Sequence, residues 1–241
     1  LLFLISLKSY TPYFARRLMR VKQEKSPESS PEKSQEKSLE IRVMTLNCRY
    51  GRANASQIIK LAKTHKIDTI LLQEVSEKLV KNLEKLGIER DFAHVQLGNT
   101  NNHENGGFNA IYTRLSNIKE SFGKSIKIDA ANVPIVTEVS GDSSAENLLI
   151  TFASAHPKSP MRGCDAWSSG IMSLAKIGEN HNKSNVKKVT IIGGDLNSTP
   201  DHPSFRALLK SGFFDASMQI GKRLKTWPTW QNPVSTKNTK I

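Results

Sequence analysis

From Ile41 onward, short apolar runs alternate with amphipathic segments, and this alternation constrains the fold more than any other feature of the sequence. The apolar runs favour strands, and they occupy 41–47, 68–74, 109–114, 134–140, 148–156 and 188–195. Helices are predicted where apolar residues recur every three or four positions, over 56–66, 77–87 and 204–212. Strands and helices that interleave in this way predict an α/β fold.

The chain is strongly basic. Its 241 residues carry a net charge of +13, and the part from Ile41 onward contributes +10 through 27 basic and 17 acidic residues. A charge of this sign favours anionic partners such as nucleic acid, phosphorylated ligands or an acidic membrane surface, and it does not choose among them. The two cysteines, Cys48 and Cys164, are too few for a disulfide scaffold and form no CxxC pair.

The first 40 residues differ in composition from the rest. Residues 1–21 begin with the apolar run LLFLIS and continue with basic and aromatic residues, a combination that suits a membrane interface. We interpret them as the end of a truncated hydrophobic membrane anchor with a basic flank; a frayed amphipathic terminus is the alternative. Residues 22–40 mix Lys, Glu, Ser and Pro with almost no apolar side chain, which predicts a solvated linker. The folded domain is therefore expected to span 41–241.

Four of the predicted strands end in polar residues that can carry chemistry. Asn47, Glu74 and His156 follow the first, second and fifth strands, and Asp195 with Asn197 follows the last in GGDLN. Apolar strands buried between layers present functional groups mainly at their ends, so these side chains are expected to meet in one cleft. They suit a phosphate ester and Mg²⁺, which takes one or two protein carboxylates and completes its shell with water and substrate oxygens.

Each of these residues also has a plainer explanation. Asn47 is a common turn residue, and GGDLNSTP is built from turn formers. Glu74 also fits the N-terminal cap region of the next helix, and His156 before Pro157 fits a loop histidine. Turn chemistry alone does not account for all of them at once, in this order, after four apolar strands.

The order LN, QE, a His after an apolar strand and then GDLN resembles the endonuclease/exonuclease/phosphatase superfamily. That group includes deoxyribonuclease I, neutral sphingomyelinases and inositol polyphosphate 5-phosphatases. The resemblance runs from Ile41 to the C-terminus, and TLNCRYGRA and TWPTW look especially like bacterial members that carry the domain behind N-terminal membrane helices. The resemblance implies a four-layer α/β sandwich, with two mixed β-sheets flanked by helices.

The resemblance also implies a role for each matching residue. Glu74 would be the principal Mg²⁺ ligand, with Asn47 beside it and Mn²⁺ as the alternative ion. Asp195 would orient or deprotonate the attacking water, and Asn197 would hold the phosphate. His156 would contact the scissile phosphate and stabilise charge in the transition state.

Two further residues, in GGFNAIYTR, lie where family members have a strand that borders the site. The resemblance implies substrate contacts for both, Asn109 and Arg114. A solvated strand end explains Arg114 equally well.

The sequence departs from the family pattern at its end. Family members close the site with a C-terminal Asp–His pair, whereas the only Asp-His after GDLN here is Asp201-His202, which is too close to that motif. We therefore expect the sequence to be a piece of a longer protein, with the C-terminal strand missing. This piece is expected to bind Mg²⁺ and to hydrolyse phosphate esters poorly, because the histidine that would manage the proton is absent.

Together these features predict Mg²⁺-dependent hydrolysis of a phosphodiester or phosphomonoester by metal-activated water. Nucleic acid and a lipid or inositol phosphate are both open as substrates, because basic charge serves either. The alternative is a membrane-tethered, non-catalytic module that binds anionic phosphate ligands on the same fold. We expect a membrane-anchored monomer with its catalytic domain outside the cytoplasm.

Overall fold

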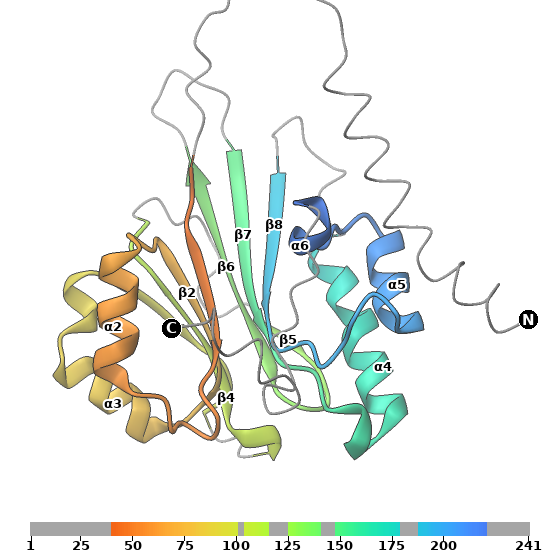
Figure 1. The fold of residues 1–241 in the computed structure, drawn as a ribbon, viewed down its shortest axis with the longest axis horizontal. Coiled ribbons are helices and arrows are strands. Elements are labelled where there is room, and N and C mark those ends of the chain that lie inside the picture. Colours follow the sequence, from red (N-terminus) through yellow and green to blue (C-terminus); the bar gives the residue numbers. More distant parts are fainter. Residues whose placement is uncertain (1–39, 101–103, 116–124, 141–147, 179–187, 221–241) are drawn as a thin grey trace, which may run out of the picture. The chain divides into compact units, whose positions relative to one another are not determined.

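A computed structural model describes residues 40–100, 104–115, 125–140, 148–178 and 188–220 (Figure 1). The chain divides into two units, 37–211 and a second made of 1–36 with 212–241, of which 212–220 are described. The predicted anchor, all but the last residue of the predicted linker, and the TWPTW stretch lie outside the described residues. Within the described ranges, no helix is long and apolar enough to cross a membrane.

The larger unit begins with a four-stranded mixed sheet in the order β1-β2-β4-β3. Its strands are β1 (Val43–Asn47), β2 (Thr69–Val75), β3 (His94–Leu97) and β4 (Phe108–Thr113). β1 and β2 are parallel, whereas β4 is antiparallel to both of its neighbours. The parallel pair needs a crossover, which α2 (Ala55–Thr64) provides. α2 and α3 (Glu77–Lys85) cover the outer face of this sheet (Figure 1).

A second four-stranded mixed sheet has the order β5-β6-β7-β8. Like the first sheet, it has one parallel pair at one edge and two antiparallel pairs beside it. Its strands are β5 (Ser125–Lys127), β6 (Asn132–Ser140), β7 (Leu148–Ala155) and β8 (Lys188–Gly194). β7 and β8 are parallel, and the remaining pairs are antiparallel. The helices α4 (Cys164–Ser173) and α5 (Pro203–Lys210) lie on the outer side of this sheet (Figure 1).

The two sheets pack face to face and give the unit four layers. Successive residues of a strand point to opposite faces, so β2 serves two cores: Leu72 packs under α2 and α3, whereas Leu71 packs against the second sheet. The inter-sheet core is made of Leu71, Ile111, Val136, Ile150 and Phe152. The prediction of a four-layer α/β sandwich with two mixed sheets is confirmed.

Polar caps fix where the first two helices begin. The Asn54 side chain accepts hydrogen bonds from Ser56 N and Gln57 N at the start of α2. Ser76 accepts from Leu79 N at the start of α3, one residue after β2 ends. The turn from β2 into α3 is therefore short and anchored, and Glu74 lies directly before it.

Several elements differ from the sequence prediction. The strands β3 and β5, the helix α4 and the 3₁₀ helices were not predicted; the latter are η1 (Ile88–Arg90), η2 (Glu104–Gly106), η3 (Pro160–Arg162) and η4 (Leu174–Ile177). β8 is less buried than its composition suggests, with Val189 44% exposed at the edge of its sheet. The helix predicted to Gly87 ends earlier, and Leu86, at its cap, is 53% exposed.

The remaining described elements carry no predicted chemistry. In the second unit, Asp215 caps the short helix α6 (Ala216–Gln219) by accepting a hydrogen bond from Met218 N.

Both cysteines are free, Cys48 buried and Cys164 exposed, as the count of two suggested. Burial first, and then the charge of Glu74, raises the pKa of the Cys48 thiol to about 12, so this thiol stays protonated.

Candidate active site

The two parallel strand pairs bring the predicted residues to one edge of the sandwich. Asn47 pairs with Gln73 in the register of β1 and β2, so Glu74 follows at the same edge of the first sheet. Ala155 pairs with Gly194 in the register of β7 and β8, so His156 and Asp195 leave the second sheet together. Because the two sheets stack, these four side chains meet.

Asn47 joins the two carboxylates. Its Nδ2 donates to Glu74 Oε1 at 2.9 Å and to Asp195 Oδ2 at 3.0 Å, and thereby links the first sheet to the second. Its Oδ1 accepts from Arg49 N at 2.8 Å. The amide therefore turns its nitrogen toward the carboxylates, which suits positioning of Glu74 and Asp195 better than the direct metal ligation predicted for Asn47.

Glu74 is held by its backbone and by its side chain. Its φ is +52°, and the pairing of β2 with β4 shifts register between Leu72 and Val75, so the strand bulges at this residue. Glu74 Oε2 accepts from Tyr50 N at 2.8 Å, while its backbone oxygen accepts from Gly51 N at 2.7 Å. The loop after β1 thus fixes Glu74 from two directions.

His156 is almost completely buried beside both carboxylates. It is 3% exposed, and its Nε2 lies 3.8 Å from Glu74 Oε1 and 4.0 Å from Asp195 Oδ2. Burial lowers the pKa of His156, and the charges of Asp195 and Glu74 oppose that shift only in part. The ring is therefore neutral near pH 7, and Asn105 Nδ2 lies 3.2 Å from its Nδ1.

Asn197 locks the loop that follows β8. Its backbone N donates to Asp195 Oδ1 at 3.1 Å, and its Nδ2 donates to Pro157 O at 3.0 Å. Trp167 of α4 donates from Nε1 to Asn197 O at 3.2 Å. One of the two amide hydrogens of Asn197 is used by Pro157, and the other suits a phosphate oxygen.

The backbone of the site is strained. Among the residues that the structure describes, six non-glycine residues have positive φ, and five of them surround the site: Arg49, Tyr50, Glu74, Asn105 and Asn197. Such conformations are uncommon for Arg, Tyr and Glu, and they persist where the surrounding structure imposes them; asparagine adopts them more readily. Gly194 is also required, because a Cβ there would collide with the carbonyl oxygen of Ala155.

Two buried polar residues that the sequence analysis did not single out brace the sheets beneath the site. Gln73 Nε2 of β2 donates to Ser154 Oγ of β7 at 2.9 Å, and Ser154 Oγ donates to Leu72 O at 2.8 Å. The only feature of the sequence that pointed to this pair was the place of Gln73 directly before Glu74.

Asn105 was also not singled out, because only its position before two glycines marks it in the sequence.

The structure separates the two predicted substrate contacts. Asn109 is fully buried on β4, where its Nδ2 donates to Asn132 O at 2.9 Å, so it supports the sheets behind the site. Arg114 lies at the far end of β2, where its backbone N donates to Asp68 O and its guanidinium stands 5.1 Å from the Phe92 ring centre. Arg114 is therefore not brought together with Glu74.

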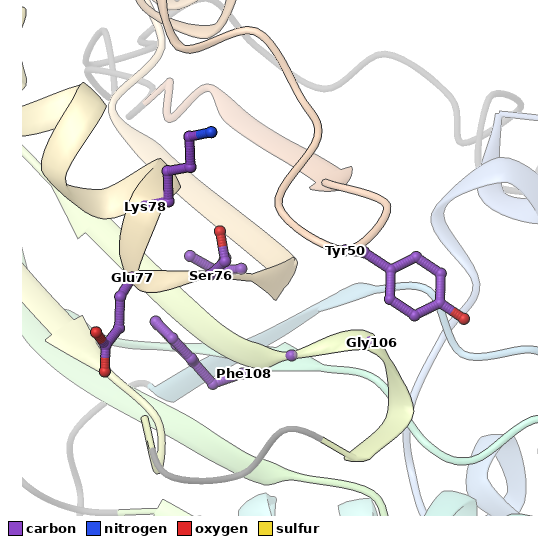
Figure 2. A pocket seen from close by; sticks show the side chains of 8 residues that line it. Tyr50, Ser76, Glu77, Lys78, Gly106 and Phe108 are labelled. Atoms are coloured by element: carbon purple, nitrogen blue, oxygen red, sulfur yellow. The ribbon is translucent and has the colours of Figure 1, made fainter.

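An open pocket of about 500 Å³ lies against the Glu74 turn (Figure 2). Its lining comes from the loop after β1, the start of α3 and the turn before β4: Tyr50, Val75, Ser76, Glu77, Lys78, Gly106, Gly107 and Phe108. Tyr50 is 53% exposed. Arg162 Nη2 donates to the Tyr50 hydroxyl at 3.3 Å, and the Arg52 guanidinium stands 5.8 Å from its ring centre. An exposed aromatic ring with two cations therefore borders the site.

The carboxylates of Glu74 and Asp195 fit a divalent cation. They face each other through one amide, and the ring of His156, which is neutral near pH 7, lies 3.8 Å from Glu74 and 4.0 Å from Asp195. A divalent cation would offset their repulsion. The described part of the chain has no group of three His, Cys, Asp or Glu side chains that could hold a metal.

Comparisons with known proteins agree with this geometry. The sequence model of the Endonuclease/Exonuclease/phosphatase family matches residues 44–240. A search of curated protein sequences found no match.

Three solved structures share the fold. Humanized D. rerio TDP2 with 14 mutations has a TM-score of 0.56 at 16% identity, over 80% of this chain and 78% of that one. Sphingomyelinase C from Streptomyces griseocarneus has a TM-score of 0.54 at 12% identity, over 73% and 70%. Truncated Caenorhabditis elegans TDP2 has a TM-score of 0.51 at 16% identity, over 66% of this chain and 63% of that one.

Proposed function

We propose that this chain, which belongs to the Endonuclease/Exonuclease/phosphatase family, hydrolyses a phosphodiester bond with Mg²⁺. The observation that carries this proposal is the Asn47 amide, which holds a carboxylate from each sheet within 3.0 Å of one nitrogen. Two like charges fixed together suit a divalent cation, which can assist hydrolysis of a phosphate ester.

Each residue of the site has one task in this proposal. Bound Mg²⁺ would supply positive charge that activates water and offsets charge on the phosphate. Glu74, fixed by Asn47 and Tyr50 N, would hold the ion. Asp195 would orient the attacking water and take its proton, and Asn197 would donate its amide to the phosphate. His156 would contact the same phosphate.

Nucleic acid is the substrate class that we propose. Tyr50 with Arg52 and Arg162 combines an exposed ring with two guanidinium groups beside Glu74, and such combinations stack bases and pair with phosphates. The net charge of +13 supports the same class. D. rerio TDP2, which has the same fold, has been solved with a single-strand DNA product, whereas Sphingomyelinase C carries a lipid substrate in its name.

Attachment to a membrane through residues 1–21 and a position outside the cytoplasm are part of the proposal. The attachment rests on the apolar, basic and aromatic pattern of these residues. The position outside the cytoplasm rests on the resemblance to bacterial members that carry the domain behind N-terminal membrane helices, whereas the basic residues by themselves would favour the cytoplasmic side. Protease accessibility in intact cells tests them: degradation from outside supports this placement, and protection contradicts it.

Hydrolysis assays with site variants test the activity. The longest natural chain that contains these residues is tested with Mg²⁺ against DNA, RNA, sphingomyelin and inositol phosphates. Asp195→Asn and Asn197→Ala are each expected to lower turnover at least about a hundredfold, the low end for loss of a general base or a positioned donor.

Asp201→Asn is the matched control, because Asp201 is exposed in the same connection after β8. It should keep its turnover. Unchanged turnover in both site variants would place the chemistry elsewhere. Mg²⁺ binding without turnover on any of the substrates would support the non-catalytic phosphate-binding module instead.

A further inference from the structure

Asn105 lies outside the sequence motifs but contacts His156 directly. It belongs to η2, just before β4, and its Nδ2 is 3.2 Å from both His156 Nδ1 and the backbone oxygen of His156. A carbonyl oxygen only accepts hydrogen bonds, so the amide atom that faces it must be the nitrogen and not Oδ1. That nitrogen carries two hydrogens, and it therefore donates to Nδ1 as well.

This contact determines which ring nitrogen of His156 carries the proton. Nδ1 accepts the hydrogen bond and so has no hydrogen, which leaves the proton of the neutral ring on Nε2. Nε2 is 3.8 Å from Glu74 Oε1 and 4.0 Å from Asp195 Oδ2, both beyond hydrogen-bond length. Neither carboxylate takes the Nε2 proton, although it faces both.

We propose that Asn105 is a positioning residue that holds His156 as a neutral Nε2–H donor aimed at a phosphoryl oxygen of the substrate. The identity of the acceptor rests on the proposed function, whereas the tautomer rests on the contacts of Asn105 alone. The opposite tautomer would turn a lone pair toward the phosphate and repel it.

The backbone explains why an asparagine stands at this position. Asn105 has a φ of +54°, and asparagine is one of the few residues other than glycine that adopt this region readily. The turn lies directly against the site, because Gly106 packs against Glu74: a Cβ on Gly106 would lie 2.5 Å from Glu74 Oε2. A residue here must therefore accept positive φ and also donate from a short amide.

Nitrogen NMR of the His156 ring tests this proposal without any need for activity. Spectra are recorded at about pH 8, above the usual histidine pKa of about 6.5, and His156→Gln identifies the signals among the six histidines. In the parent protein, Nδ1 should be unprotonated and hydrogen-bonded, and Nε2 protonated. Asn105→Asp offers only acceptors, so Nδ1 should gain a proton.

Asn105→Gly removes the side-chain amide and keeps the backbone conformation, because glycine adopts positive φ freely. It therefore distinguishes the effect of the amide from the effect of the backbone. In this variant, the Nδ1 resonance of His156 should shift to that of a nitrogen without a hydrogen bond. The kcat should fall about 10–100-fold, as for loss of other orienting partners. Lys66→Gly is the control: Lys66 is exposed, has a φ of +52° and lies between α2 and β2, away from the site. It should change neither signal nor rate.

A protonated Nδ1 in the parent protein, or an Nδ1 signal that is the same in the parent and both Asn105 variants, would overturn the proposal. Conversely, the predicted signals in a protein that cleaves none of the phosphodiesters would leave the role of Asn105 standing and would count against the proposed function alone.

Discussion

Three asparagine side chains hold the functional groups of the site at the scale of single residues. Asn47 joins Glu74 to Asp195, Asn105 supports His156, and Asn197 ties the loop after β8 to Pro157. An amide supplies two donors without a charge of its own. It can therefore fix carboxylates in place while their negative charge stays available for a metal ion.

The buried neutral histidine predicts a specific dependence of stability on pH. Because burial lowers the pKa of His156, the folded protein binds fewer protons than the unfolded protein below the ordinary pKa of about 6.5. The free energy of unfolding should therefore fall as the pH drops from about 7.5 to about 5.5. Denaturant titrations in EDTA measure this.

His156→Gln serves as the reference for that experiment, because it removes the titrating ring. Its free energy of unfolding should depend less on pH than that of the parent protein across the same interval. An equal or steeper fall in the variant would contradict a lowered pKa for His156.

Motif residues could be predicted because their chemistry shows in the sequence. The five residues Asn47, Glu74, His156, Asp195 and Asn197 follow apolar strands, and the structure brings them together. Asn105 and Gln73 were missed, because their roles depend on which strands of the two sheets face each other. Arg114 was expected near the site because the local sequence pattern does not show the direction of a strand. That direction decides at which end of β4 Arg114 lies.

At the scale of elements, strong periodicity was a reliable guide and weak periodicity was not. β2 and α3 were found because long apolar or amphipathic patterns define them. α4 was missed because Gly170 and three serines interrupt its sequence CDAWSSGIMS. β5 has only three residues and takes its form from pairing with β6, which no local pattern reveals.

The turn before β4 is the element that we expect to tolerate change least. In Gly106→Ala, the new methyl group would meet the Glu74 carboxylate at 2.5 Å, and the φ of +90° would be strained. We expect a loss of about 2–4 kcal/mol in the free energy of unfolding, from strain plus overpacking, together with weaker Mg²⁺ binding. Denaturant titration and calorimetry measure the two effects.

Gly212→Ala is the control for the steric overlap. Gly212 has a comparable φ of +106°, but no atom lies within 4 Å of the added carbon, so this variant has the backbone strain without the overlap. It should lose only the strain contribution of about 1–2 kcal/mol and should keep its Mg²⁺ affinity. Equal effects of the two substitutions on metal binding would show that Gly106 does not support Glu74.

At the scale of the whole sandwich, the site exists only where the two sheets meet. Glu74 belongs to the first sheet and Asp195 follows the second, and Asn47 donates a hydrogen bond to each, reaching Asp195 across 148 residues of sequence. Gln73 and Ser154 brace the same junction from beneath. Assembly of the metal site should therefore report on correct packing of both sheets, and metal binding is the most direct probe of the account.

Calorimetric titration of Mg²⁺ into the parent protein, Glu74→Gln and the control Glu77→Gln tests the central claim that Glu74 holds the ion. Glu77 is an exposed carboxylate three residues further on, at the start of α3. Glu74→Gln should weaken Mg²⁺ binding at least about tenfold, equivalent to about 1.4 kcal/mol, with little change in stability, whereas Glu77→Gln should bind as the parent does. Unchanged Mg²⁺ affinity in Glu74→Gln, or an equal loss in Glu77→Gln, would contradict the claim.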